Sequence, residues 1–237
     1  MCNNDPNREQ EQNNIDSIKE LGVQDPSKII GKQRFQVLPI IGQIEGHSAL
    51  PPQSKATKYE HLIPQLVDIE TNDSIEGVLI ILNTVGGDVE AGLAIAEMIN
   101  SLSKPSVSLV IGGGHSIGVS LATSADYSFI SPSATMIIHP IRMNGLVLGV
   151  PQTFEYFNKM QERIIDFITR TSKMKSETFR KLMLQTDDLL NDMGTILIGK
   201  QAVDYGLIDE VGGLSSAINK LEDIIDNGDK RTSWEFL

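Results

Sequence analysis

The sequence has almost no cysteine, no long apolar segment and no excess of positive charge. Cys2 is the only cysteine among 237 residues, which excludes a disulfide framework and a thiolate metal site. No run of about 18 apolar residues occurs, so a membrane-spanning helix is not expected. The formal net charge of −11 argues against a nucleic-acid partner, because phosphate binding normally needs a basic surface.

Two targeting and binding motifs are also missing. The N-terminus, MCNNDPNREQEQNN, lacks the basic start and the apolar core of a secretory signal peptide, so we expect a cytoplasmic protein. The phosphate-binding loop of P-loop nucleotidases does not occur either. We therefore expect neither a cofactor nor a metal, and assign any ATP-dependent step to a separate partner.

Composition divides the chain into three parts. Residues 1–30 are rich in Asn, Gln, Asp and Glu and contain no aromatic residue, which is typical of a flexible arm that cannot bury enough apolar surface to fold alone. Residues 31–228 contain the apolar segments and predict one domain. Residues 229–237 form a polar tail.

Two strand–glycine–helix units dominate the middle of the chain. GVLIILN at 77–83 is followed by TVGG and an amphipathic helix, and a buried strand at 106–111 is followed by GGG and a small-residue helix that begins near Ser116. Continuous apolar strands predict a buried parallel sheet, with both glycine turns at the same edge. The flanking elements that we expect are strands at 34–44, 127–132 and 135–140, and helices at 58–70, 152–172, 176–185 and 214–225. The helix at 152–172 has a broken apolar stripe, so we expect it to project from the domain.

Ser116 and His139 are the candidates for chemistry. Ser116 follows three glycines at a predicted helix start, where free N–H groups favour negative charge. Of the four histidines, His139 closes an apolar strand, whereas the ring of His115 is expected to point away from its neighbour Ser116. A helix N-cap role for Ser116 and a structural role for His139 remain open at this point. GHSIG also matches the serine elbow of α/β-hydrolases, but that fold requires a later histidine, and none follows His139.

Four segments in order resemble landmarks of the Clp protease proteolytic subunit family, ClpP. They are LNTVGG, GGGHSIG, MIIHP and AVDYGLIDEV, and the similarity covers about residues 35–225. Val85 stands where the family has proline, and Pro140 where it has glutamine. With these departures and the N-terminal arm, the chain resembles the translocation-enhancing (TepA) branch of ClpP-like proteins more than the housekeeping ClpP subunit.

The resemblance implies an α/β fold, a spiral of repeated β-β-α units with a protruding handle helix, and a serine-type endopeptidase. Ser116 would be the nucleophile and His139 the general base, with backbone N–H groups of Gly86 and Ile117 forming the oxyanion hole. Substrates would be peptides or unfolded proteins that enter a chamber of stacked homo-oligomeric rings. The helix at 152–172 would join the rings, and a separate ATP-dependent unfoldase is a candidate partner.

The resemblance also implies a third catalytic residue, an acid that would orient His139, and this residue is the least defined. The family spacing falls on Gly194, which has no side chain, so we predict Asp192 instead, with Asp187 and Asp188 as alternatives or no acid at all. Without an acid the protein would be an inactive ClpP-like scaffold. A second alternative is a crotonase-like acyl-CoA enzyme, which shares the spiral fold but leaves the pairing of Ser116 with His139 unexplained.

Overall fold

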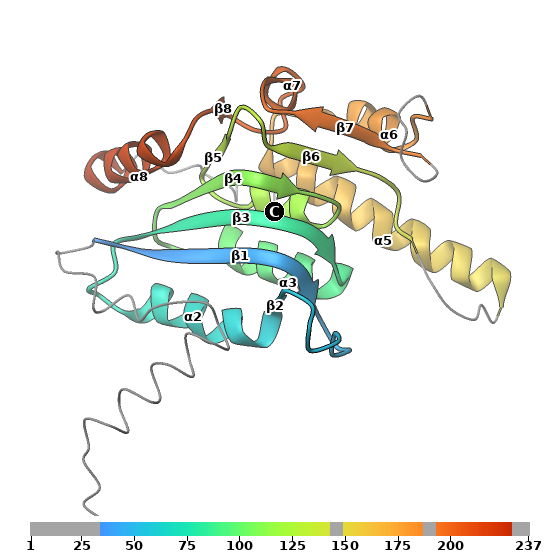
Figure 1. Ribbon diagram of the computed structural model, residues 1–237, viewed down its shortest axis with the longest axis horizontal. Helices are drawn as coiled ribbons and strands as arrows, with labels where there is room; N and C mark the ends of the chain where they lie inside the picture. The colour runs from blue at the N-terminus through green and yellow to red at the C-terminus, as the bar shows by residue number, and fades with distance from the viewer. Residues whose placement is uncertain (1–33, 143–148, 187–192, 229–237) are drawn as a thin grey trace, which may run out of the picture.

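The computed structural model describes residues 34–142, 149–186 and 193–228, and these form an α/β structure around one mixed sheet (Figure 1). The strands are β1 (Phe35–Glu45), β2 (Ala56–Lys58), β3 (Gly77–Gly87), β4 (Ser106–Gly114), β5 (Tyr127–Ile130), β6 (Thr135–Ile138), β7 (Thr195–Ile198) and β8 (Glu210–Val211). The helices are α2 (Tyr59–Thr71), α3 (Val89–Asn100), α4 (Gly118–Thr123), α5 (Val150–Thr171), α6 (Ser176–Met183), α7 (Lys200–Asp204) and α8 (Leu214–Asn227). The predicted arm at 1–30 and tail at 229–237 lie outside the described residues.

The main sheet is parallel throughout, in the order β2-β1-β3-β4-β5-β8. β6 leaves this path: it bridges β4 at Gly113 and Thr135 and pairs antiparallel with β7. Strand–helix units succeed one another along the chain, as the two strand–glycine–helix patterns predicted. All the carboxyl ends of β1, β3 and β4 therefore lie at one edge of the sheet.

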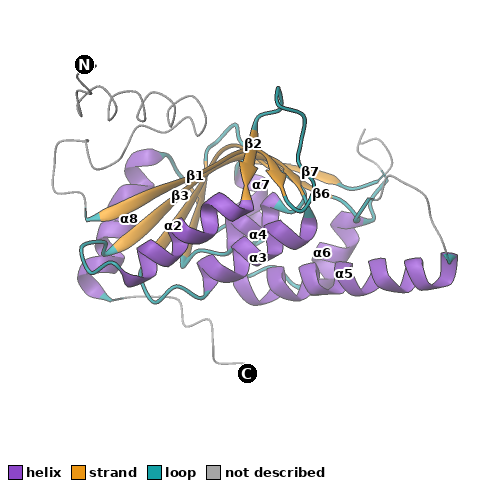
Figure 2. Ribbon diagram, turned by 90° about the horizontal axis from the view of Figure 1, so that it is seen from below, coloured by secondary structure: helices purple, strands orange, loops and turns teal. Residues whose placement is uncertain are grey.

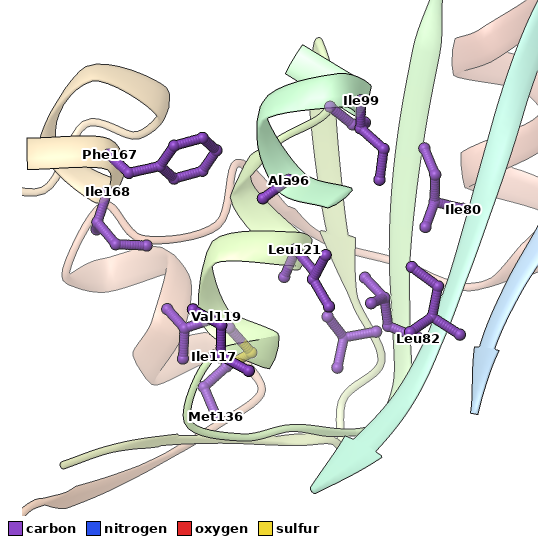
Figure 3. Close-up of a cluster of buried hydrophobic side chains, with 14 of the residues drawn as sticks. Ile80, Leu82, Ala96, Ile99, Ile117, Val119, Leu121, Met136, Phe167 and Ile168 are labelled. Carbon is purple, nitrogen blue, oxygen red and sulfur yellow. The ribbon is translucent and has the colours of Figure 1, made fainter. Parts of the chain in front are cut away.

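Both faces of the sheet are covered, which explains the unbroken apolar run of β3. Ile80 and Leu82 belong to a cluster with α2, α3, α4 and α5. Leu79 and Ile81, which alternate with them along the strand, pack with α8 on the opposite face. Successive strand side chains point to opposite faces, so a strand covered on both must be apolar at every position. Figure 3 shows the larger cluster, in which Ile117 and Val119 approach Met136 of β6.

The long helix predicted at 152–172 is α5, and it extends well past the sheet (Figures 1 and 2). Its second half is anchored by buried side chains such as Ile165, Phe167 and Ile168. Its first half exposes large apolar groups, with Val150 at 70% and Phe154 at 66% of their accessible surface. The broken stripe of the sequence thus corresponds to one buried half and one projecting half.

Among the element boundaries that differ from the prediction, two concern the residues around Gly86 and Ser116. β3 does not stop at Asn83, because Gly86 and Gly87 still pair with Gln43 and Ile44 of β1 beyond a bulge. The helix expected to begin near Ser116 begins at Gly118, after a turn. Both differences arise at the glycines, whose wide conformational range makes a boundary hard to place from sequence.

Candidate active site

The glycine ends of β3 and β4 touch each other. A Cβ atom built on Gly86 would lie 2.7 Å from both the His115 carbonyl oxygen and Ser116 Cβ. Gly86 also has φ +86°, a region that other residues rarely adopt. Only glycine fits here, and its lack of a side chain lets the TVGG turn reach the serine's turn.

Ser116 is held in a strained backbone conformation. Its φ of +57° makes it the one non-glycine residue with positive φ within residues 34–142, 149–186 and 193–228. This left-handed region costs roughly 1–2 kcal/mol for an L-residue. The Ser116 N–H donates to the Ile137 carbonyl of β6 at 2.8 Å, which ties the strained residue to the neighbouring strand. The N-cap interpretation is wrong, because Ile117 occupies the cap of α4 and no side chain caps it.

His139 immediately follows β6 and faces the same cavity as Ser116. This cavity has a volume of about 190 Å³. Its lining is mostly apolar, with one cation and one amide: Gly87, Val89, Ser116, Ile117, Val119, Ile138, His139, Ile141, Arg142, Gln161, Ile164, Phe179 and Met183. Nucleophilic catalysis requires a hydroxyl close to a base such as an imidazole, and these two side chains line the same cavity.

The tautomer of His139 follows from one hydrogen bond. Its Nδ1 lies 2.6 Å from the Pro140 carbonyl oxygen. A carbonyl oxygen only accepts, so Nδ1 carries the proton and donates it. In the neutral ring Nε2 then has the lone pair and is able to accept a proton.

The backbone N–H groups of Gly86 and Ile117, which the sequence suggested as oxyanion donors, differ in their partners. The Gly86 N–H donates to Thr84 Oγ1 at 3.0 Å, whereas Gly87 lines the cavity. Among the described residues, no hydrogen-bond acceptor for the Ile117 N–H is found. Sequence reasoning singled out Gly86 and missed Gly87, and two adjacent glycines give no signal that separates them.

His115 lies outside the cavity lining, as expected from its position next to Ser116. Its Nε2 is 2.8 Å from Thr135 Oγ1 at the start of β6. Burial, and secondly the nearby His139, lower the pKa of His115 below its ordinary value. Both effects disfavour the charged ring, so His115 is neutral at neutral pH.

The predicted acids at Asp187, Asp188 and Asp192 lie outside the described residues. Gly194 is described: its N–H donates to the Gln185 carbonyl at 2.7 Å. β6 and β7 pair Ile138 with Thr195, and continuing this register places Gly194 opposite His139. The sequence position that the family spacing selects therefore lies at the end of the β6–β7 pairing, next to the segment that carries His139, although it has no carboxylate.

Two features are absent from the part of the chain that the structure describes. No three His, Cys, Asp or Glu side chains there gather as a metal site. None of the helices in the same ranges is both long and apolar enough to cross a bilayer.

Comparison with known proteins identifies the family. The family model for Clp protease matches residues 37–214. The translocation-enhancing protein TepA of Halalkalibacterium halodurans is 57% identical over 90% of this chain and 82% of its own length. ATP-dependent Clp protease proteolytic subunits are more distant. That of Lactococcus lactis subsp. cremoris is 28% identical over 63% of this chain and 74% of its own, and subunit 1 of Protochlamydia amoebophila is 25% identical over 69% and 75%.

The chain therefore belongs to the Clp protease family. The resemblance inferred from the four segments is confirmed, including its similarity to a TepA protein, and so is the α/β ClpP fold.

The strain at Ser116 makes a stability prediction. Because glycine has no Cβ, we expect Ser116→Gly to have a higher free energy of unfolding than Ser116→Ala by roughly 1 kcal/mol. Urea denaturation of both variants measures this difference. The opposite order would show that the left-handed backbone at 116 is not strained.

The lowered pKa of His115 predicts a pH-dependent stability. The unfolded chain binds a proton near the ordinary value of 6.5, whereas the folded chain resists it, so the free energy of unfolding decreases as the pH falls below about 6.5. We expect His115→Gln to lose less stability than the unsubstituted protein between about pH 7.5 and about pH 5.5. Thermal melts at the two pH values measure this loss of stability, with His47→Gln in an exposed loop as the control. Equal losses in all three proteins would contradict the prediction.

Proposed function

We propose that the protein is a serine-type endopeptidase in which Ser116 is the nucleophile and His139 the general base and then the general acid. The observation that carries the proposal is that the two side chains line one cavity, with Ser116 on a strained left-handed turn. Strain of this kind clusters at active sites. The match to the Clp protease family favours this chemistry over the crotonase-like alternative.

The tautomer of His139 fits the proposed first step. With Nδ1–H donated to the Pro140 carbonyl, Nε2 accepts the Ser116 hydroxyl proton as Oγ attacks the substrate carbonyl. The same nitrogen then returns the proton to the leaving amine, and water releases the acyl group by the reverse path. The lowered pKa of His115 disfavours a charged His115 ring beside His139.

The oxyanion that forms in this attack needs backbone donors at the cavity. Ile117 N–H has no acceptor among the described residues, which suits it for the role. Gly86 was the second donor expected from sequence, but its N–H is bonded to Thr84 Oγ1. We therefore propose Gly87, which lines the cavity, as the second donor. Each such donor typically stabilises a transition state by roughly 3 kcal/mol.

Asp192 remains our proposal for the acid, with Asp187 and Asp188 as alternatives. It precedes Gly194 by two residues, and Gly194 directly precedes Thr195, which pairs with Ile138 next to His139. A carboxylate there would stabilise the imidazolium, which the uncharged Pro140 carbonyl does less well. If no carboxylate fills this role, a slow Ser–His dyad or an inactive scaffold results.

The cavity and α5 support the remaining parts of the proposal. A mainly apolar cavity of about 190 Å³ fits an apolar side chain of a peptide or unfolded protein. The exposed apolar residues on the first half of α5 fit contact with a second copy in stacked rings. We further propose a cytoplasmic location and delivery of substrates by a separate ATP-dependent unfoldase, because the distant relatives are named as subunits of an ATP-dependent protease.

A fluorophosphonate probe tests the chemistry. We expect covalent labelling of Ser116 in the unsubstituted protein, and a loss of at least about a thousandfold in labelling rate for both Ser116→Ala and His139→Ala, since triad members act as a unit. Mass spectrometry identifies the labelled residue. Absence of labelling would support the scaffold alternative.

The size of the assembly tests the role of α5. A charge at an apolar contact is costly to bury, so we expect Phe154→Glu to lower the native mass from that of a multi-subunit particle. Lys159→Glu, at another exposed position of the same helix, is the matched control. Native mass spectrometry or light scattering gives the masses. An unchanged mass in Phe154→Glu would argue against contact through α5.

A further inference from the structure

His115 is a half-buried titratable side chain beside the nucleophile that the proposed reaction does not use. Its ring is absent from the cavity lining, so it does not touch a substrate bound there. Instead Nε2 lies 2.8 Å from Thr135 Oγ1. The question is what a histidine immediately before Ser116 contributes.

The local structure is built to hold this ring. A Cβ atom on Gly113 would lie 3.0 Å from His115 Cε1 and 3.1 Å from Nε2, so the imidazole packs over Gly113. This contact explains one glycine of the GGG run, because any side chain at 113 would crowd the ring. The His115 backbone is bonded as well: its N–H donates to the Thr84 carbonyl at 3.1 Å, and its carbonyl accepts from the Gly118 N–H at 2.8 Å.

The partner of the ring belongs to the strand that carries the proposed base. Thr135 is the first residue of β6, and His139 follows its last residue, Ile138. The turn that carries Ser116 therefore contacts β6 at two levels. The Ser116 N–H binds the Ile137 carbonyl, and the His115 ring binds Thr135 two residues earlier. The second contact is the only one of the two made by a side chain.

We propose that His115 is a positioning residue, which fixes the turn of the nucleophile against the strand of the base through its hydrogen bond to Thr135. The inference rests on the proposed peptidase function. Transfer of the Ser116 proton to His139 depends steeply on their separation and alignment. A strained turn relaxes easily when a contact is removed, so a side-chain bond one residue away keeps the hydroxyl in place.

The electrostatics agree with a holding role rather than an acid–base role. The pKa of His115 is lowered, chiefly by burial and then by His139. A neutral ring at Thr135 can donate or accept with the hydroxyl, and it adds no charge that would oppose protonation of His139. With Nε2 engaged, His115 also does not compete with His139 for the serine proton.

Four substitutions in the full chain test the proposal. His115→Leu and Thr135→Val remove the bond with little change of volume, whereas His115→Gln and Thr135→Ser retain a polar atom able to form it. We expect the first pair to slow fluorophosphonate labelling of Ser116 about tenfold each, as befits the loss of one hydrogen bond. The second pair should stay within about threefold of the unsubstituted protein. The double variant His115→Leu/Thr135→Val should be no slower than either single variant, because both remove the same bond. With a peptide substrate, kcat should fall and KM should stay the same.

The outcomes separate this inference from the proposed function. Equal labelling rates in all variants, or a double variant slower by the product of the single effects, would overturn the positioning role alone. Reduced melting temperatures with unchanged labelling would show a purely structural bond and would also overturn it. If the unsubstituted protein does not label at Ser116, the peptidase function fails, and the inference fails with it.

Discussion

The close approach of two glycine turns is the constraint on which the site depends. β3 and β4 are parallel neighbours, so their carboxyl ends meet, and the TVGG and GGGHS turns must share one small volume. Gly86 tolerates this because it has no side chain to collide with Ser116. The backbone of Ser116 is forced into the left-handed region, and the hydrogen bond to Ile137 secures it. Packing in the sheet therefore maintains the strain at the serine.

β6 connects this turn to the imidazole. The strand leaves the main sheet after a single bridge to β4 and pairs with β7. As a result His139 emerges at the cavity, and its ring is oriented by the carbonyl of the next residue, Pro140. The backbone carbonyl of Pro140 supplies the hydrogen-bond acceptor. The proposed base thus obtains its tautomer locally, without needing a distant side chain for that task.

The first half of α5 projects from the sheet and exposes apolar side chains. Its buried half packs on the core, whereas Val150 and Phe154 extend past the sheet into solvent. A monomer with such a surface exposes apolar area that a second copy would cover. Enclosing the serine inside an assembly would also restrict access to chains that enter it.

The sequence alone determined the α/β class, the family, and Ser116 and His139 as candidates, because apolar strands and glycine turns are local patterns with few structural solutions. It did not determine that Ser116 has φ +57°, that Gly86 is already hydrogen-bonded while Gly87 faces the cavity, or that His115 binds Thr135. These features depend on which strands become neighbours and how closely they pack. Residues 83 and 113, or 115 and 135, are brought together only by the pairing of β3, β4 and β6, and no pattern along the chain encodes those distances.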